Sequence, residues 1–418
     1  MEIIKNRVLS NDILRVLRIK PFFLLMLSEF FSQFAFNMQH FVLIFIIYGL
    51  THSNTAVSGM ILSFMIPAVL FSVVTGVYVD RWNKKKVLLY THIIRGALLL
   101  PFLIPDLHLG LIYALTFLIA VATQFFIPAE SAIIPTLVPK KLIISANAVF
   151  AFSLYGSIII GYVFSGPVLL LLGKTHTISF LILLFCISAI FVTAIRTTGR
   201  KVSTAEDLSP SMSFSIVREA REIFTFLRKV RKVMHALFML TIAQAVIFMF
   251  AVLAPGYVTT ILRAPLESLS VILIAPAGLG LGVGAFILGS IGKRFKHKWL
   301  SALGFMAVGI VFILLPIVSN INVFNINLLH IIVVLAFIIG FAISLVFIPS
   351  NATIQIETGE AMRGRMYGLL SSLIGAVSFL PVVAAGGLAD LLGVGAVITG
   401  VGVLMIIIGI FYLFLIKF

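Results

Sequence analysis

The sequence predicts an all-α membrane protein whose twelve transmembrane helices form two pseudo-symmetric halves of six. Three observations predict this fold: the composition, the length of the segments without charged residues, and an internal repeat. Hydrophobic residues make up 61% of the 418 residues and charged residues only 11%, whereas about 25% of a soluble domain is charged. The mean hydropathy is +1.20. So few charges cannot cover a soluble surface, and the expected solvent is a lipid bilayer.

Long segments that lack Asp, Glu, Lys and Arg mark the transmembrane helices. A helix needs roughly 20 apolar residues to cross a hydrocarbon core about 30 Å thick. The two longest such runs, 30–79 and 299–356, are each long enough for two helices and a polar hairpin. The uniform runs do not alternate in short segments as the strands of a membrane barrel do. The predicted spans are 21–49, 54–79, 87–105, 108–130, 146–172, 176–195, 233–262, 268–292, 299–318, 327–348, 366–389 and 392–416.

The basic residues lie almost entirely on one side of these helices. Of 30 lysines and arginines, 27 lie in the N-terminal tail, the even-numbered connections or the C-terminal end. Lys174 and Arg263 lie on the opposite side, and Arg95 lies inside a span. Because cytoplasmic loops are enriched in basic residues, both termini are predicted to be cytoplasmic. The net charge of +16 is thus explained by membrane orientation, and no nucleic-acid partner is expected.

Other kinds of site have little support in the sequence. The single cysteine, Cys186, excludes a disulfide framework and a cysteine-rich metal site. The eight histidines form no HExxH motif and no close cluster, so neither a metal nor a cofactor is expected. The glycine-rich run from Gly278 to Gly284 lies inside an apolar span, where it predicts close helix packing rather than nucleotide binding. No acid, base and nucleophile come together in the spans, so the chain is not expected to be an enzyme.

A polar segment separates two related halves. The predicted domains are an N-terminal half over 1–195, a cytoplasmic linker over 196–232 and a C-terminal half over 233–418. From Phe214 to Val230, apolar residues recur at three- and four-residue steps opposite a basic face. This pattern predicts an amphipathic helix on the membrane surface. We interpret that helix as a tether near anionic lipid, in preference to a regulatory switch.

Two pairs of similar segments indicate that the halves arose by duplication. FIPAESAIIPTLVP (126–139) ends span four, and FIPSNATIQIETGE (347–360) ends span ten. GVYVDRWNKKKVL (76–88) follows span two, and GSIGKRFKHKWLS (289–301) follows span eight at a similar offset. Parallel six-helix repeats are typical of secondary transporters, in which the substrate site lies near the midplane between the halves.

The connection after span two begins at Gly76 and continues through Asp80, Arg81, Lys84 and Lys85. It resembles the signature loop of the major facilitator superfamily, G-x-x-x-D-R-x-x-x-[KR], and the resemblance covers essentially the whole chain. The resemblance implies that the acid interacts with a helix N-terminus of the other half and that the basic residues pair with nearby acids. Such contacts would form a cytoplasmic gate. The alternative for the lysines is a plain anchor on the cytoplasmic side.

Further segments resemble the branch of this family that contains macrolide-type and siderophore-type exporters, which are drug:H⁺ antiporters. They are Arg95-Gly96-Ala97, Phe126-Ile127-Pro128-Ala129 and, as part of the gate, Arg363-Gly364-Arg365. Span five carries part of the antiporter motif, Gly156, Gly161 and Gly166-Pro167. Proton-coupled drug exporters often carry an arginine in span four, and Gln124 is the polar side chain nearest to that position.

Charged residues inside a membrane span are costly, which makes them functional candidates by default. Glu29 lies about 12 Å along span one, and Gln33, Asn37 and His40 follow it on the same helical face. This stripe is expected to face the central cavity. Glu29 could carry a coupling proton or bind a cationic substrate, and the alternative is a structural partner for Arg95.

The remaining candidates lie in spans three, four and seven. Arg95, with His92 one turn earlier, is interpreted as a member of a structural or gating ion pair with Glu29 or Glu130. Glu130, near the cytoplasmic end of span four, is assigned to the gate. Weaker candidates for the cavity wall in the second half are Gln244, Thr241 and Tyr257.

These observations predict a secondary active exporter of the cell membrane that moves an amphipathic or hydrophobic small molecule outward by alternating access against proton entry. The expected partners are a small-molecule substrate, the lipid bilayer and protons, and the chain is expected to act as a monomer. The alternative is an uptake carrier, a facilitator or a lysophospholipid-type lipid transporter on the same fold. A non-transporting membrane receptor is less favoured because no sizeable extramembrane domain is predicted.

Overall fold

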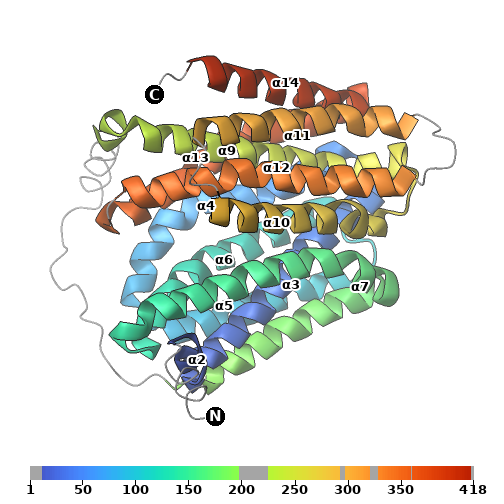
Figure 1. The fold of residues 1–418 in the computed structure, drawn as a ribbon. Coiled ribbons are helices and arrows are strands. Elements are labelled where there is room, and N and C mark those ends of the chain that lie inside the picture. The colour runs from blue at the N-terminus through green and yellow to red at the C-terminus, as the bar shows by residue number, and fades with distance from the viewer. Residues whose placement is uncertain (1–11, 197–224, 292–296, 321–327, 359, 416–418) are drawn as a thin grey trace, which may run out of the picture. The chain divides into compact units, whose positions relative to one another are not determined.

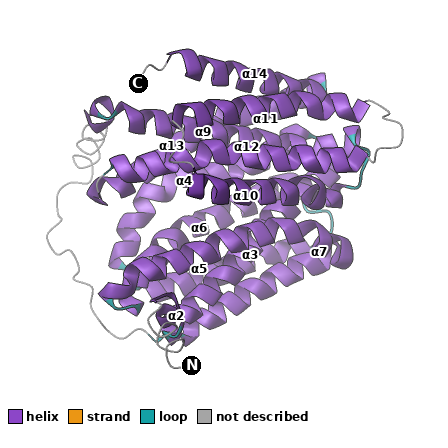
Figure 2. Cartoon of the chain, viewed as in Figure 1, coloured by secondary structure: helices purple, strands orange, loops and turns teal. Residues whose placement is uncertain are grey.

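The predicted fold class is confirmed. The computed structural model describes residues 12–196, 225–291, 297–320, 328–358 and 360–415. These residues form helices joined by short connections, and no strand occurs among them (Figure 2). Within them, eleven helices are long and apolar enough to cross a membrane.

The first six predicted spans correspond to five long helices, because the last of them contains two spans. The 52 residues of α7 would extend about 78 Å, more than twice the hydrocarbon thickness. At Gly173 the backbone leaves the helical region with φ +70°, and the chain turns back on itself there (Figure 1). The helices are α2 (Asp12–Leu17), α3 (Lys20–Thr51), α4 (Asn54–Arg81), α5 (Lys84–Leu99) with the 3-10 turn η1 (Leu100–Leu103), α6 (Leu109–Leu137) and α7 (Ile143–Ala194).

The last six predicted spans are six separate helices. Two of them begin or end in irregular turns, which surround the connection between spans seven and eight. The helices are α9 (Arg231–Gly256) with the π-helical turn η3 (Tyr257–Ile261), α10 (Ala275–Ile291) preceded by the 3-10 turn η4 (Leu266–Ser268) and the π-helical turn η5 (Ser270–Ile274), α11 (His297–Asn320), α12 (Leu328–Glu357), α13 (Glu360–Leu392) and α14 (Val394–Leu415).

Two helices run well beyond the predicted ends of their spans. Helix α6 continues through Pro128 and Pro135, and α12 continues through Pro349. A proline removes one backbone hydrogen bond, but membrane helices tolerate this where neighbouring groups satisfy the freed carbonyl. Residues near the predicted ends of spans four and ten consequently lie inside regular helix.

The predicted amphipathic helix of the linker lies mostly outside the described residues. Only its last part is described, and residues 225–229 are helical. There Phe226, Leu227 and Val230 pack against a buried apolar cluster that includes Val233 and Leu237 of α9. In this described part, the apolar side chains contact protein.

The chain forms two compact units, and their composition differs from a simple division at the linker. One unit comprises Met1–Leu43 and Ile66–Leu208, and the other comprises Ile44–Met65 and Ser209–Phe418. The end of α3 and the first half of α4 thus group with the helices of the second half. We refer to Ile44–Met65 as the α3–α4 hairpin.

The glycines of spans eight and ten allow two helices to pack backbone to backbone, and for span eight the sequence predicts such close packing. A Cβ atom on Gly340 of α12 would overlap the carbonyl oxygen of Ala277 in α10, and one on Gly284 would overlap the hydroxyl of Ser344. Small residues allow such close approach between membrane helices, where packing replaces the hydrophobic effect as the main attraction.

Gly340→Ala is expected to destabilise the protein by about 1–3 kcal/mol, because the added methyl group forces the backbones of α10 and α12 apart. Gly282→Ala is the matched control: it makes the same change in α10, at a position with no atom within 4 Å of the added Cβ. Thermal unfolding of the purified proteins in detergent measures both. Equal melting temperatures for the two variants would contradict the close contact.

Candidate functional site

Three charged residues lie buried inside the first unit, on three different helices. Glu29 of α3 and Arg95 of α5 are 0% exposed, and Glu130 of α6 is 6% exposed. They lie about 14, 17 and 11 Å from Lys20, Lys84 and Leu137, the helix ends that the basic residues assign to the cytoplasm. The depths of the three residues along their helices thus differ by about 6 Å, and Arg95 lies near the middle of its span.

A chain of hydrogen bonds holds Arg95 and fixes a histidine beside it. The Arg95 Nη2 group donates to Ser32 Oγ at 3.1 Å and to His92 Nδ1 at 3.0 Å. Arginine can only donate, so His92 Nδ1 accepts and its Nε2 carries the hydrogen. That nitrogen lies 3.2 Å from Ser28 Oγ, which donates in turn to the Ser188 carbonyl at 3.0 Å. His92 therefore positions the guanidinium as a neutral acceptor.

Aromatic rings enclose the same guanidinium. Its carbon lies 4.3 Å from the ring centre of Phe126 and 5.0 Å from that of Phe185. Phe126 also belongs to a buried apolar cluster with Phe22 and Leu88. The Nη1 atom of Arg95 is buried and has no hydrogen-bond partner. The guanidinium is thus only partly satisfied in a site closed to lipid.

The carboxyl group of Glu29 has fewer hydrogen-bond partners than the guanidinium of Arg95. Neither oxygen makes a hydrogen bond of standard geometry, although both are buried. Glu130 and Arg95 lie close enough to Glu29 to interact with it electrostatically. The ion pairs found among the described residues do not include Arg95. The structure thus places the three residues close together without an ion pair of Arg95 among those it describes, and their roles stay predictions.

We name Glu29, Arg95 and Glu130 the buried charged group. It holds two carboxyl groups against one guanidinium. Leaving a net charge in low-dielectric surroundings is costly, so one arginine balances one carboxylate. The second carboxyl group can then be neutralised by a proton or by a bound cation. The group can accordingly accept and release one positive charge inside the membrane.

The other members of the span-one stripe lie against the first leg of α7. Asn37 donates to the Gln33 carbonyl at 2.7 Å, and its Cβ atom lies where Gly161 leaves room for close packing. The Tyr162 hydroxyl lies 3.4 Å from His40 Nδ1. Gln33 itself is near Glu29. Within this unit the stripe thus borders α7, and Gln33 is the member that adjoins the buried charged group.

Sequence reasoning missed Gln39. Its side chain is fully buried, and neither its amide nitrogen nor its amide oxygen has a hydrogen-bond partner. It lies outside the stripe that begins at Glu29. A lone amide in an apolar span was the only available signal, and it does not distinguish a buried position from one that lines a cavity.

The gate residues are described only in part. For Gly76, Asp80, Arg363 and Arg365 the side-chain surroundings lie outside the described part of the chain, so their gate role stays a prediction.

The basic residues of the same connection have visible positions. Arg81 is exposed, and Lys84 is half-buried at the start of α5. Lys85 Nζ donates to the carbonyls of Thr193 and Ile195 at 2.8 and 2.7 Å. A lysine at the end of a helix stabilises its unpaired carbonyls and its dipole. Lys85 thus fixes the end of α7 to the start of α5.

The remaining candidates have separate surroundings. Gln124 of α6 and Gln244 of α9 are half-buried, and no described contact joins them to the buried charged group. Thr241 is buried and bonds within its own helix. Tyr257 is fully buried and donates to the Leu315 carbonyl of α11 at 3.1 Å. The Tyr257 hydroxyl thus joins η3 to α11, and its position on the cavity wall stays a prediction.

Asp390, at the end of α13, is a second residue that the sequence reasoning missed. Its carboxylate accepts hydrogen bonds from the Asn54 and Thr55 backbone amides at 2.8 and 3.0 Å. It also accepts from the Ser53 hydroxyl at 2.6 Å and the Asn54 amide at 2.9 Å. These amides open α4, where a carboxylate satisfies unpaired N–H groups and the positive end of the helix dipole.

The α3–α4 hairpin makes further contacts with other helices of its own unit. The Ser58 hydroxyl donates to the Val382 carbonyl at 2.9 Å, and the Tyr48 and Thr259 hydroxyls lie 3.0 Å apart. At Gly386, a Cβ atom would overlap Ser58. We name these contacts and the Asp390 hydrogen bonds the hairpin clamp. The only indication of the hairpin clamp in the sequence is Asp390, a lone acid between apolar spans. The partner of such an acid depends on the tertiary structure.

A metal centre has no support among the described residues, since none of them form a group of three or more His, Cys, Asp or Glu side chains that could hold an ion.

Comparisons with known proteins cover almost the whole chain. Residues 25–382 match the sequence profile of the Major Facilitator Superfamily. The chain is 24% identical to the multidrug efflux pump Tap of Mycolicibacterium fortuitum over 88% of its length and 89% of that protein. It is 23% identical to macrolide efflux protein A of Streptococcus pyogenes over 81% of its length and 82% of that protein. Its fold is similar to that of the nucleoside transporter NupG, with a TM-score of 0.74 at 12% identity over 96% of this chain and 100% of NupG.

Proposed function

The chain belongs to the major facilitator superfamily and is a multi-pass membrane transporter, and we propose that it exports an amphipathic or hydrophobic small molecule across the cell membrane against proton entry. The family consists of transporters and not of enzymes, in agreement with the sequence. Both termini are proposed to be cytoplasmic, from the distribution of basic residues. A transporter without an ATP site must draw its energy from a gradient.

The buried charged group is the observation that carries the proton-coupling part of the proposal. Glu29 is fully buried with neither oxygen in a hydrogen bond of standard geometry, and one guanidinium lies near two carboxyl groups. The second carboxyl group takes up a proton when the site faces the outside and releases it to the cytoplasm. Phe22, Leu88 and Ile133 of one buried apolar cluster lie nearer than the group to the helix ends assigned to the cytoplasm, so we expect the proton to cross only with a change of conformation.

The relatives support the outward direction. Two of them are named as efflux proteins, and each aligns over more than four fifths of this chain. At 23–24% identity their substrates do not carry over, so the proposal extends only to the class of substrate. The similar solved structures support the fold alone. An uptake carrier, a facilitator or a lipid transporter on the same fold remains the alternative.

In inverted membrane vesicles, an imposed proton gradient, acidic inside, is expected to drive accumulation of hydrophobic dyes or macrolides. A protonophore should abolish this accumulation, since it removes the driving force while leaving the binding site intact. Vesicles without the protein provide the control for passive entry. Accumulation that is unchanged by the protonophore would reject proton antiport, and equilibration without accumulation would identify a facilitator.

A further inference from the structure

A second cavity lies in the second unit, away from the buried charged group. It has a volume of about 710 Å³ and lies between α9, α11, α12 and α14. Lys232 and His297 lie where α9 and α11 begin, and Glu357 lies where α12 ends. The basic-residue distribution assigns all these helix ends to the cytoplasm. The cavity thus opens at the depth of the inner membrane–water interface.

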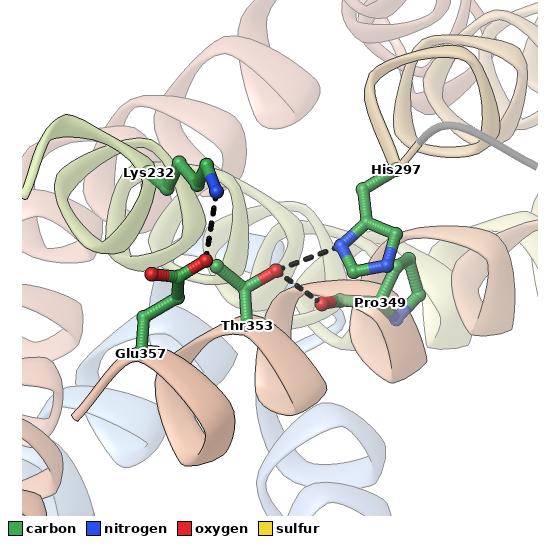
Figure 3. A network of polar contacts seen from close by, with 5 residues as sticks. All are labelled: Lys232, His297, Pro349, Thr353 and Glu357. Carbon is green, nitrogen blue, oxygen red and sulfur yellow. Dashed lines mark hydrogen bonds and ion pairs between the residues drawn. The ribbon is translucent and has the colours of Figure 1, made fainter. Parts of the chain in front are cut away.

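A polar network connects three of these helices across the cavity (Figure 3). Lys232 Nζ of α9 lies 2.8 Å from Glu357 Oε1 of α12. His297 Nδ1 of α11 lies 2.8 Å from Thr353 Oγ1, and that hydroxyl donates to the Pro349 carbonyl at 2.8 Å. Because the single hydroxyl hydrogen is already donated, Thr353 accepts from His297 Nδ1–H. The other ring nitrogen, Nε2, takes no part in the hydrogen bond to Thr353.

The charges that line the cavity favour an anion. Lys232, Lys298, His235 and His297 line it, and Glu357 is the acidic side chain among its lining residues. Two lysines and one carboxylate are among the lining residues, so the net charge of the lining is positive. With His297 held by Nδ1, a protonated ring would present Nε2–H as a further donor to an anion.

The rest of the lining is suited to lipid. Trp299 is 54% exposed, Ile356 is 77% exposed, and Tyr412 lines the cavity near the end of α14. Tryptophan and tyrosine favour the interface, where one end of the ring is apolar and the other is wet. A soluble anion would gain nothing from these apolar surfaces, whereas the glycerol and first methylene groups of a lipid would cover them.

We propose that this cavity binds the phosphate headgroup of an anionic phospholipid from the cytoplasmic leaflet. Basic pockets between transmembrane helices on the cytoplasmic side are suited to such headgroups, and a volume of about 710 Å³ lies in the range of specific ligand sites. Lys232 and Lys298 bind the phosphate, and Glu357 opposes it. The proposal goes beyond the proposed export function and holds whatever the transported substrate.

The test is a titration of the purified full chain in detergent micelles with phosphatidylglycerol or phosphatidylcholine, read by native mass spectrometry. K232Q/K298Q is expected to bind phosphatidylglycerol about 30-fold more weakly, because each basic residue near an anionic lipid contributes about a fivefold effect. K140Q/K141Q removes two exposed charges from another cytoplasmic connection and should bind like wild type. E357Q should bind about fivefold more tightly, because it removes the acid that competes for Lys232.

E357Q also protects the test against loss of folding, since tighter binding cannot come from an unfolded protein. Equal affinities for K232Q/K298Q and K140Q/K141Q would overturn the proposal, as would equal binding of phosphatidylcholine and phosphatidylglycerol. Displacement of the lipid by inorganic phosphate at similar concentration would show that the cavity is a soluble-phosphate site instead. Failure of proton-driven transport in the vesicle assay would leave these binding results unaffected.

Discussion

Glu29→Gln is expected to lower proton-driven accumulation by about tenfold or more while the protein stays folded and inserted. The amide has nearly the shape of the carboxyl group, so the packing around residue 29 is kept. The amide cannot exchange a proton, however. The buried charged group of the variant then always contains one carboxyl group and the Arg95 guanidinium. Substrate movement down its own gradient should persist, because binding and conformational change remain possible without net proton transfer.

The measurement compares two fluxes in the same inverted vesicles: accumulation driven by a proton gradient, and exchange of substrate with no gradient imposed. Loss of the first with survival of the second identifies coupling. Glu267→Gln is the control, since it makes the same chemical change in the connection before α10. If Glu29→Gln accumulates substrate with the pH dependence of wild type, the role of Glu29 in coupling is wrong. Loss of both fluxes together with lower thermal stability would indicate a structural role.

The two carboxyl groups of the site are expected to act as one unit. Glu130→Gln should impair coupling as Glu29→Gln does, and the double substitution should cost little more than either single one. Groups that interact directly give strongly non-additive effects in double-mutant cycles. Fully additive losses would show instead that Glu130 works separately, as the sequence assignment to the gate implies.

The sequence predicts the membrane elements well and the contacts between them less well. Charge-free runs locate the spans because each helix alone must satisfy the bilayer. The same rule identifies Glu29 and Arg95 as functional candidates, since a charged side chain inside a membrane span is energetically costly. Glu130 was harder to place, because α6 continues two turns past it to Leu137. The depth of Glu130 in the membrane depends on where α6 ends, and Pro128 and Pro135 make that end difficult to predict from the sequence.

The hairpin clamp shows more clearly that contacts between helices are difficult to predict from the sequence. Asp390 is a lone acid between two apolar spans, and nothing along the chain indicates that it caps a helix more than 330 residues away. Capping within one helix follows a local pattern. Capping between helices depends on how the helices pack, which one sequence does not reveal. The same holds for His92, whose role as a neutral acceptor follows only from the position of Arg95.

Cross-linking the two sides of the hairpin clamp is expected to stop transport completely and reversibly. The α3–α4 hairpin comes from the first half of the sequence and Asp390 from the second, although both belong to the same compact unit. Alternating access by rocking of two halves requires that contacts between them on the outer face separate in each cycle. A covalent link at this point holds one state, whereas hydrogen bonds to an exposed carboxylate can exchange with water.

The experiment uses S53C and D390C together in a C186S background, which removes the single native cysteine. The Ser53 and Asp390 oxygens lie 2.6 Å apart, so a short bis-methanethiosulfonate can join cysteines at these positions through two disulfides, which a reductant cleaves. Flux should stop on cross-linking and return after reduction, and each single-cysteine variant should keep its flux after treatment with the same reagent. Flux that continues with the link intact would show that the hairpin and α13 move as one body.

D390N separates the clamp's contribution to stability from its contribution to gating. The oxygen of an asparagine can still accept from the two Asn54 donors, but its amide nitrogen cannot replace the oxygen that accepts from Ser53 and Thr55. The loss of a helix-capping carboxylate costs about 1–2 kcal/mol. That energy shifts a two-state equilibrium by about tenfold toward the outward-open state. The variant should therefore slow transport only partly. It should also make the substrate site more accessible from the outside. A clamp with a purely structural role would not change that accessibility.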